Sequence, residues 1–111
     1  MKHDKVYLSN IIDAIDRILD YTEGVDKPEF DQNTMIQDAV IRNFEIIGEA
    51  TKNISSDFRK DHNHIPWKNM AGMRDKLIHN YMGVDLDAVW QTITDILPSL
   101  HENISDLSAE S

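Results

Sequence analysis

The sequence contains no cysteine and little glycine or proline, with four Gly and three Pro in 111 residues. The absence of cysteine excludes a disulfide-based fold, a Cys-liganded zinc site and a thiol nucleophile. No apolar run exceeds four residues, whereas a membrane-spanning helix needs about 20. We therefore expect no membrane segment, no signal peptide and a cytoplasmic protein. The size and the 41% hydrophobic content predict one compact helical domain over residues 1–111, with a frayed tail from about residue 106.

Positive charge is scarce, since 11 basic residues face 20 acidic ones and the net charge is −9. This balance disfavours non-specific binding to nucleic acids, because neutralisation of phosphates by Lys and Arg supplies most of that affinity. The bases are nevertheless concentrated in residues 57–83, while residues 84–111 contain none. The basic residues of the first stretch are Arg59, Lys60, Lys68, Arg74 and Lys76. An anionic ligand is therefore expected to bind there.

Apolar residues recur at helical spacing in four segments, and no alternating strand pattern of useful length is present. The predicted helices cover residues 4–22, about 32–54, 66 to just before 83, and 85 onward with a kink at Pro98. Gly24 is expected to end the first helix, Asp31 or Asn33 to begin the second, and Asp85 to begin the fourth. The pattern predicts an all-α, up-and-down bundle of four to five helices.

Arg74 interrupts the apolar pattern of the third predicted helix. A helical projection places it in the middle of the apolar stripe, among Met70, Leu77, Ile78 and Tyr81. Burial of an unpaired guanidinium would be strongly unfavourable.

Three arrangements would relieve this problem. The side chain of Arg74 could extend to solvent, or it could pair with an acid such as Glu45 or Glu49. Alternatively, this face could be a subunit interface or a polar cleft between subunits, because a symmetric interface presents the same patch twice.

Further polar residues accompany this arginine. His79 would lie about 140° around the same helix, and Asp75, four residues earlier, could orient its imidazole; taken alone, His79 is typical of a solvated surface residue. Asn43 lies on the apolar midline of the second helix, where it could bridge helices or hold His79 or Arg74 in place. Gly48 would allow a neighbouring helix or subunit to approach closely.

A metal site is weakly indicated. His62 and His64 form a possible pair of ligands, but two histidines in an expected loop make only half of a site. We therefore predict no metal and no cofactor.

Three stretches resemble one known family. Residues 74–81 read as Arg-x4-His-x-Tyr, the signature of the HepT group of HEPN-domain proteins. The runs 42–50 (RNFEIIGEA) and 65–73 (IPWKNMAGM) also resemble the corresponding segments of that group. The resemblance extends from about residue 5 to about residue 105.

The resemblance implies an all-α bundle that forms a homodimer through the motif-bearing helix, so that two Arg-x4-His motifs face each other. Many such proteins are metal-independent RNases that act as toxins. Members of this group are typically encoded beside a minimal nucleotidyltransferase antitoxin, which transfers AMP to the motif tyrosine. That tyrosine would here be Tyr81.

These residues support a specific hypothesis, RNA cleavage by attack of the ribose 2′-hydroxyl. His79 would serve as general base or general acid, since an unperturbed imidazole has a pKa of about 6.5, and Arg74 would bind the phosphate. The expected supporting or RNA-contacting residues are Asn43, Lys68, Asp75, Lys76 and Asn80. The alternative is a non-catalytic dimeric module that docks a nucleotidyltransferase.

Overall fold

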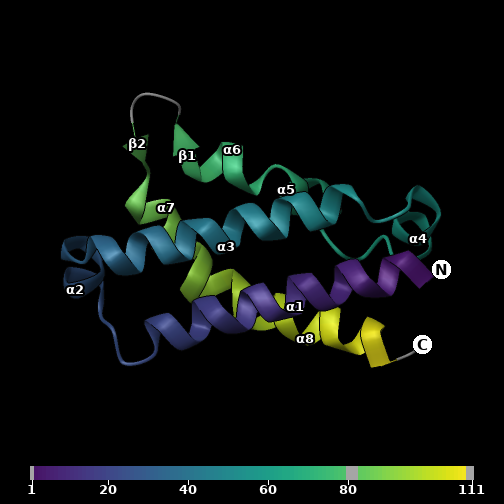
Figure 1. Ribbon diagram of the computed structural model, residues 1–111, viewed down its shortest axis with the longest axis horizontal. Coiled ribbons are helices and arrows are strands. Elements are labelled where there is room, and N and C mark those ends of the chain that lie inside the picture. The colour runs from purple at the N-terminus through teal and green to yellow at the C-terminus, as the bar shows by residue number, and fades with distance from the viewer. Residues whose placement is uncertain (1, 80–82, 110–111) are drawn as a thin grey trace.

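The fold is organised around two long helices, α1 (Lys2–Thr22) and α3 (Thr34–Lys52), which run antiparallel (Figure 1). The computed structural model describes residues 2–79 and 83–109. Within these residues, α1 and α3 share the most extensive contact of any two elements. The last helix, α8 (Leu97–Ala109), packs on α1, and α5 (Trp67–Ala71) and α6 (Met73–Leu77) pack on α3. The all-α class is confirmed.

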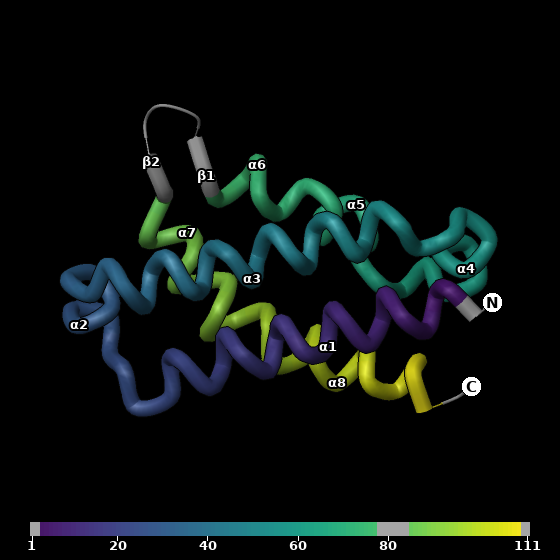
Figure 2. Tube along the Cα trace, viewed as in Figure 1, coloured from purple at the N-terminus to yellow at the C-terminus, as the bar shows by residue number. Residues whose placement is uncertain are grey.

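Short elements complete the chain. They are α2 (Lys27–Gln32), α4 (Ser56–Asp61), the two-residue strands β1 (Ile78–His79) and β2 (Gly83–Val84), α7 (Leu86–Gln91) and the π-helix Thr92–Ile96. The molecule measures 42 × 30 × 20 Å. Figure 2 shows that the first turn of α1 and the last turn of α8 lie at the same end of the molecule. Over the described ranges, no helix has both the length and the apolar character needed to cross a bilayer.

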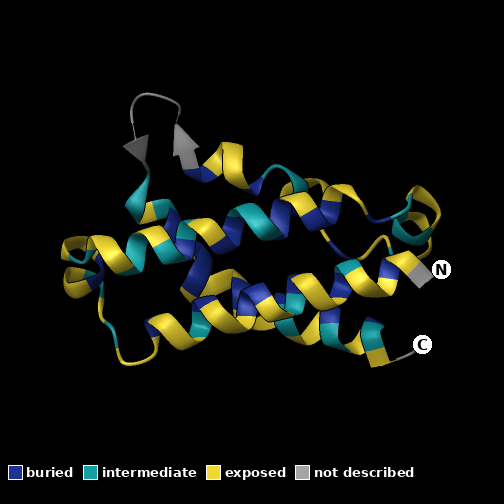
Figure 3. Cartoon of the chain, viewed as in Figure 1, coloured by how far each residue is buried: buried dark blue, intermediate teal, exposed yellow. Residues whose placement is uncertain are grey.

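The core is formed by the predicted apolar stripes. Buried and exposed residues alternate by turn along α1 and α3, so each presents one face to the interior (Figure 3). The fully buried side chains include Leu8, Ile11, Ile15, Ile18, Phe30, Phe44, Ile47, Leu97 and Ile104. Burial of such side chains provides the main driving force for folding.

The beginning of the second helix differs from the prediction. Asn33 caps α3, its Oδ1 accepting a hydrogen bond from the Ile36 amide at 3.1 Å. The preceding residues form a separate helix, α2, which has Pro28 in its first turn and Asp26 as its cap. Gly24 has φ +75°, the left-handed conformation expected just after a helix. Of the two predicted caps, Asn33 is confirmed and Asp31 is wrong, because Asp31 belongs to α2, a short helix that the apolar spacing did not predict.

Lys27 of α2 forms one ion pair within its own helix and one with α7. The Nζ of Lys27 lies 2.8 Å from the Asp31 carboxylate and 2.6 Å from that of Asp87. Hydrogen bonds to Asp31 and Asp87 raise the pKa of Lys27 above its ordinary value of 10.5. The contact with Asp87 links α7 to α2, the helix that directly precedes α3.

The third predicted helix is wrong in its second half. Gly72 separates α5 from α6, and α6 ends at Leu77. Residues 78–79 then pair antiparallel with residues 83–84. The Leu77 carbonyl accepts a hydrogen bond from the Asp85 amide at 3.0 Å, which closes the hairpin in place of another helical turn.

The C-terminal segment is helical throughout but irregular. Asp85 caps α7, as predicted, by accepting the Ala88 amide at 3.0 Å. A π-helical turn over Thr92–Ile96 then precedes Pro98, which lacks an N–H to continue the α-helical pattern. α8 reaches Ala109 and buries Leu107, so residues 106–109 of the expected frayed tail are helical.

Candidate functional site

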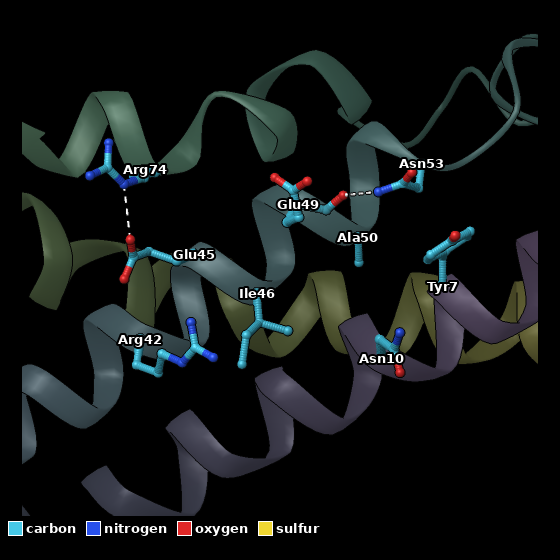
Figure 4. A pocket seen from close by; sticks show the side chains of 9 residues that line it. All are labelled: Tyr7, Asn10, Arg42, Glu45, Ile46, Glu49, Ala50, Asn53 and Arg74. Atoms are coloured by element: carbon cyan, nitrogen blue, oxygen red, sulfur yellow. Dashed lines mark hydrogen bonds and ion pairs between the residues drawn. The ribbon is translucent and has the colours of Figure 1, made fainter.

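Arg74 lies on the exposed side of α6 and is paired with α3. Its Nε donates a hydrogen bond to Oε2 of Glu45 at 2.9 Å (Figure 4). Its Nη1 lies 3.9 Å from Oδ1 of Asp75. The side chain of Arg74 is 57% exposed. The carboxylate of Glu45 therefore fixes one edge of the guanidinium, and the opposite edge faces solvent.

This position corrects the expectation that Arg74 occupies the middle of an apolar stripe. The projection assumed one continuous helix, but Gly72 starts a new short helix whose buried residues are Met73 and Leu77. Arg74 consequently lies outside that buried edge. Of the arrangements considered from sequence, pairing with Glu45 is confirmed.

Arg74 forms one wall of a surface groove of about 470 Å³. Figure 4 shows Arg74 projecting from α6 on one side of α3, and Tyr7 and Asn10 projecting from α1 on the other side. The floor is the outer face of α3, which contributes Arg42, Glu45, Ile46, Glu49 and Ala50, together with Asn53, the cap that follows the helix. Two guanidinium groups, two carboxylates and one phenol ring thus share a single groove.

Arg42 is the second cation of this groove. It is exposed and lies three residues before Glu45, so the two side chains emerge from adjacent turns of α3. Among the residues that the structure describes, the Arg42 side chain forms no hydrogen bond or ion pair. Neither Arg42 nor Tyr7 was identified from sequence as a site residue. The sequence pattern that could have indicated Arg42 is the spacing of three and four residues between Arg42, Glu45 and Glu49, which places the three charged side chains on one face of α3.

The rest of the predicted motif is less fully defined. The backbone of His79 pairs with Gly83 in the hairpin, while the His79 side chain, Asn80 and Tyr81 lie outside the described residues. The expected helical relationship between Asp75 and His79 is wrong, because α6 ends before His79.

The predicted supporting residues occupy two environments. Lys68 on α5 and Asp75 and Lys76 on α6 are exposed. Asn43, by contrast, is only 4% exposed. Its Nδ2 donates to the Ala39 carbonyl at 2.8 Å and its Oδ1 accepts from Arg17 on α1 at 3.5 Å. Asn43 therefore bridges α1 and α3, one of the two roles expected for it.

Gly48 lies where α5 crosses α3. A Cβ built at this position would meet the Ala71 carbonyl oxygen at 3.4 Å and that of Met70 at 3.5 Å. The predicted close backbone approach is confirmed, and the neighbour is α5 of the same chain. This contact sets the separation between α3 and the elements that lead to Arg74.

The histidine pair after α4 is engaged in local packing. The His62 ring stacks on Phe58 with a centroid distance of 4.3 Å, and its centroid lies 6.4 Å from that of His64. The His62 Nδ1 lies 3.0 Å from the Phe58 carbonyl oxygen. No group of three or more His, Asp or Glu residues suited to a metal occurs in the described part of the chain.

Comparison with known proteins gives consistent matches. The chain is 45% identical over 109 residues to a "Gamma-glutamylcyclotransferase and putative RNase" of Methanocaldococcus jannaschii, covering 98% of this chain and 49% of that protein. It is 37% identical over 107 residues to a "Putative RNase" of Caldanaerobacter subterraneus subsp. tengcongensis, covering 96% of both chains. It is 49% identical over 96 residues to the "Probable ribonuclease HepT" of Thermococcus cleftensis, covering 86% of this chain and 87% of the relative.

The first of these relatives is about twice as long as the matched region, whereas the other two are matched over most of their length. No solved structure gives a significant match. The family model "Ribonuclease HepT-like" matches residues 11–107, which include the groove residues of α3 and the Arg74–Tyr81 motif. The chain therefore belongs to the HepT-like ribonuclease family.

Proposed function

We propose that the protein is a metal-independent endoribonuclease in which Arg74 binds the scissile phosphate and His79 transfers protons. One observation carries this proposal: Arg74 is held at its Nε by Glu45 and exposes the rest of its guanidinium, five residues before His79. Membership of the HepT-like ribonuclease family and the names of the relatives support the choice of RNA as substrate.

The geometry at Arg74 suits a phosphate ligand. With Nε bonded to Glu45, 57% of the Arg74 side chain remains exposed, and within the described residues Nη2 forms no hydrogen bond or ion pair. A guanidinium preorganised in this way can donate to phosphate oxygens and stabilise negative charge that develops in the transition state. Because the carboxylate already orients the side chain, less conformational entropy is lost on binding.

The proposed reaction is transesterification at phosphorus. The ribose 2′-oxygen loses its proton to a neutral imidazole and bonds to phosphorus, while the bond from phosphorus to the 5′-oxygen breaks. The departing 5′-oxygen takes a proton from a protonated imidazole. The products are a 2′,3′-cyclic phosphate and a 5′-hydroxyl end, and DNA is not a substrate because it lacks the nucleophile.

A homodimer is part of this proposal. One imidazole cannot act as base and acid in the same step, whereas two copies of His79 across a two-fold axis supply both roles. Association through the motif-bearing segment would bring the two arginines to one cleft as well.

The proposed function also includes regulation by a partner enzyme. A minimal nucleotidyltransferase antitoxin would transfer AMP to the hydroxyl of Tyr81, two residues beyond His79. The added phosphate would repel the RNA backbone and occlude the site. Lys68, Asp75, Lys76 and Asn80 would act as secondary contacts around it.

The test is cleavage of single-stranded RNA by the purified, unmodified protein in the presence of a chelator. Cleavage with a 2′,3′-cyclic phosphate product is expected for the wild type and is expected to be lost in Arg74→Ala and in His79→Ala, with the dimer retained in both variants by sedimentation. Intact RNA with the wild-type protein would instead favour the alternative, a non-catalytic dimeric module that docks a nucleotidyltransferase.

A further inference from the structure

We propose that the groove between α1 and α3 is a subsite for one nucleotide of single-stranded RNA, adjacent to the nucleotide whose phosphate Arg74 binds. Arg42 would bind the neighbouring phosphate and Tyr7 would stack on the base. This inference rests on the proposed ribonuclease function and extends it to residues outside the Arg-x4-His-x-Tyr motif.

Continuity with Arg74 is the first argument. Arg74 lines the same groove of about 470 Å³ as Arg42, and Glu45 separates the two guanidinium groups (Figure 4). A chain whose phosphate contacts Arg74 can enter the groove without crossing another element. The volume lies within the range of about 300–1,000 Å³ that is typical of small-molecule pockets. The groove therefore suits one nucleotide better than a long stretch of RNA.

The charge of Arg42 is the second argument. Because Glu45 is bonded to Arg74 at 2.9 Å, the groove carboxylate three residues after Arg42 is already paired with another cation. Arg42 is exposed, and inside the described ranges its guanidinium has no hydrogen bond or ion pair. Although the protein has a net charge of −9, Arg42 is an exposed cation without an ionic partner in the described residues, and it lies beside a second arginine. Such a pair of guanidinium groups is suited to an anionic ligand.

The opposite end of the groove suits a base. Tyr7 is half-buried and projects from α1 toward the end of α3 that carries Asn53 (Figure 4). A ring fixed in this way offers a face on which an unpaired base can stack, which is the common mode of binding single-stranded RNA. The exposed amide of Asn10 and the carboxylate of Glu49 line the same groove and can bond to base edges.

The two ends therefore differ in chemistry. Both arginines lie toward the α6 end of the groove, where phosphates would bind, and the phenol ring lies at the other end. A duplex would not present an unstacked base to Tyr7, so the groove favours single strands.

The experiment measures binding of a short single-stranded RNA with 2′-O-methyl groups, which removes the nucleophile and prevents cleavage. Affinity is measured as a function of salt concentration. Each phosphate contact contributes about 0.7 to the slope of log affinity against log salt for single strands. Arg42→Ala is expected to lower that slope by about 0.7. Lys52→Ala is the matched control, because it removes one exposed positive charge from α3 outside the groove.

The aromatic end is tested separately. Tyr7→Ala is expected to weaken binding by roughly tenfold at every salt concentration without a change in slope, whereas Tyr7→Phe retains the ring and the affinity. Because Tyr7 packs against the core, circular dichroism checks that Tyr7→Ala is folded. If Tyr7→Ala is not folded, the salt dependence of Arg42→Ala still decides the test, because Arg42 is exposed and its replacement leaves the core intact.

The outcomes distinguish this inference from the proposed function. If the wild type neither cleaves nor binds RNA, the ribonuclease proposal itself fails. If the wild type binds RNA in an Arg74-dependent manner but Arg42→Ala behaves like Lys52→Ala and Tyr7→Ala like Tyr7→Phe, only the subsite is wrong. Loss of self-association in Arg42→Ala or Tyr7→Ala, with the RNA salt slope unchanged, would make the groove an interface between copies and overturn the subsite.

Discussion

Arg74 on α6 and Glu45 on α3 are joined by a 2.9 Å hydrogen bond between side chains 29 residues apart in sequence. The pair is solvent-accessible on both sides, with exposed fractions of 57% for Arg74 and 36% for Glu45. Exposed ion pairs contribute only about 0.2–1 kcal/mol to folding. The contact is therefore better suited to orienting the guanidinium than to holding the fold together.

Replacement of Glu45 should separate orientation from stability. Glu45→Ala is expected to lower kcat for RNA cleavage by about tenfold, because a misplaced guanidinium stabilises the transition state less well. KM should change less, and Glu45→Asp should recover part of the activity. The measurement is steady-state cleavage of a defined RNA together with thermal unfolding.

The control for this prediction is Glu102→Gln, which removes an exposed carboxylate from α8, outside the groove. Cleavage by Glu102→Gln should match that of the wild type. Equal activity of Glu45→Ala and the wild type would show that Arg74 needs no positioning residue.

Asn43 should matter for stability and not for catalysis. Loss of its hydrogen bonds to Ala39 and Arg17 in Asn43→Ala is expected to lower the free energy of unfolding by about 1 kcal/mol. That corresponds to a fall of roughly 4 °C in Tm for a domain of this size. Chemical denaturation measures the first quantity, and cleavage per folded molecule should stay constant. A specific loss of activity in folded protein would place Asn43 in the site instead.

Gly48 should accept one carbon atom and reject larger side chains. In Gly48→Ala the new Cβ would lie 3.4 Å from the Ala71 carbonyl oxygen, an ordinary contact, while the helix gains up to about 1 kcal/mol of propensity. Gly48→Leu should destabilise by about 1–3 kcal/mol, because α5 cannot move away without disturbing buried Trp67 and Met70. Thermal unfolding of the two variants provides the comparison. A stable Gly48→Leu protein would show that α5 is free to shift.

Tyr81 should be the residue through which a partner enzyme silences the protein. Coexpression with a minimal nucleotidyltransferase is expected to add AMP to the wild type and to abolish RNA cleavage, because the added phosphate repels RNA. Tyr81→Phe should remain unlabelled and active. Intact-mass spectrometry records the modification. A labelled and inactive Tyr81→Phe protein would contradict the proposal.

Local sequence was sufficient to predict much of the helical framework. The apolar spacing of α1 and α8 reflects one face of each helix buried in the core, so periodicity alone locates them. The cap Asp85 accepts a hydrogen bond from an amide only three residues later, so it can be predicted from local sequence. Gly24 likewise adopts the positive φ that glycine favours just after a helix. The Arg-x4-His-x-Tyr motif likewise indicates the family to which the chain belongs.

Tertiary structure decided what surrounds Arg74. The break at Gly72 and the hairpin after Leu77 depend on contacts with α3 and with Asp85, and no helical periodicity encodes them. The groove exists because α1 and α6 flank the outer face of α3, which brings Tyr7, Arg42 and Arg74 together from distant parts of the chain. Sequence fixes which side chains are available and which helix face they occupy. Only packing between helices determines which of them share a surface, because that depends on how the backbone segments approach one another.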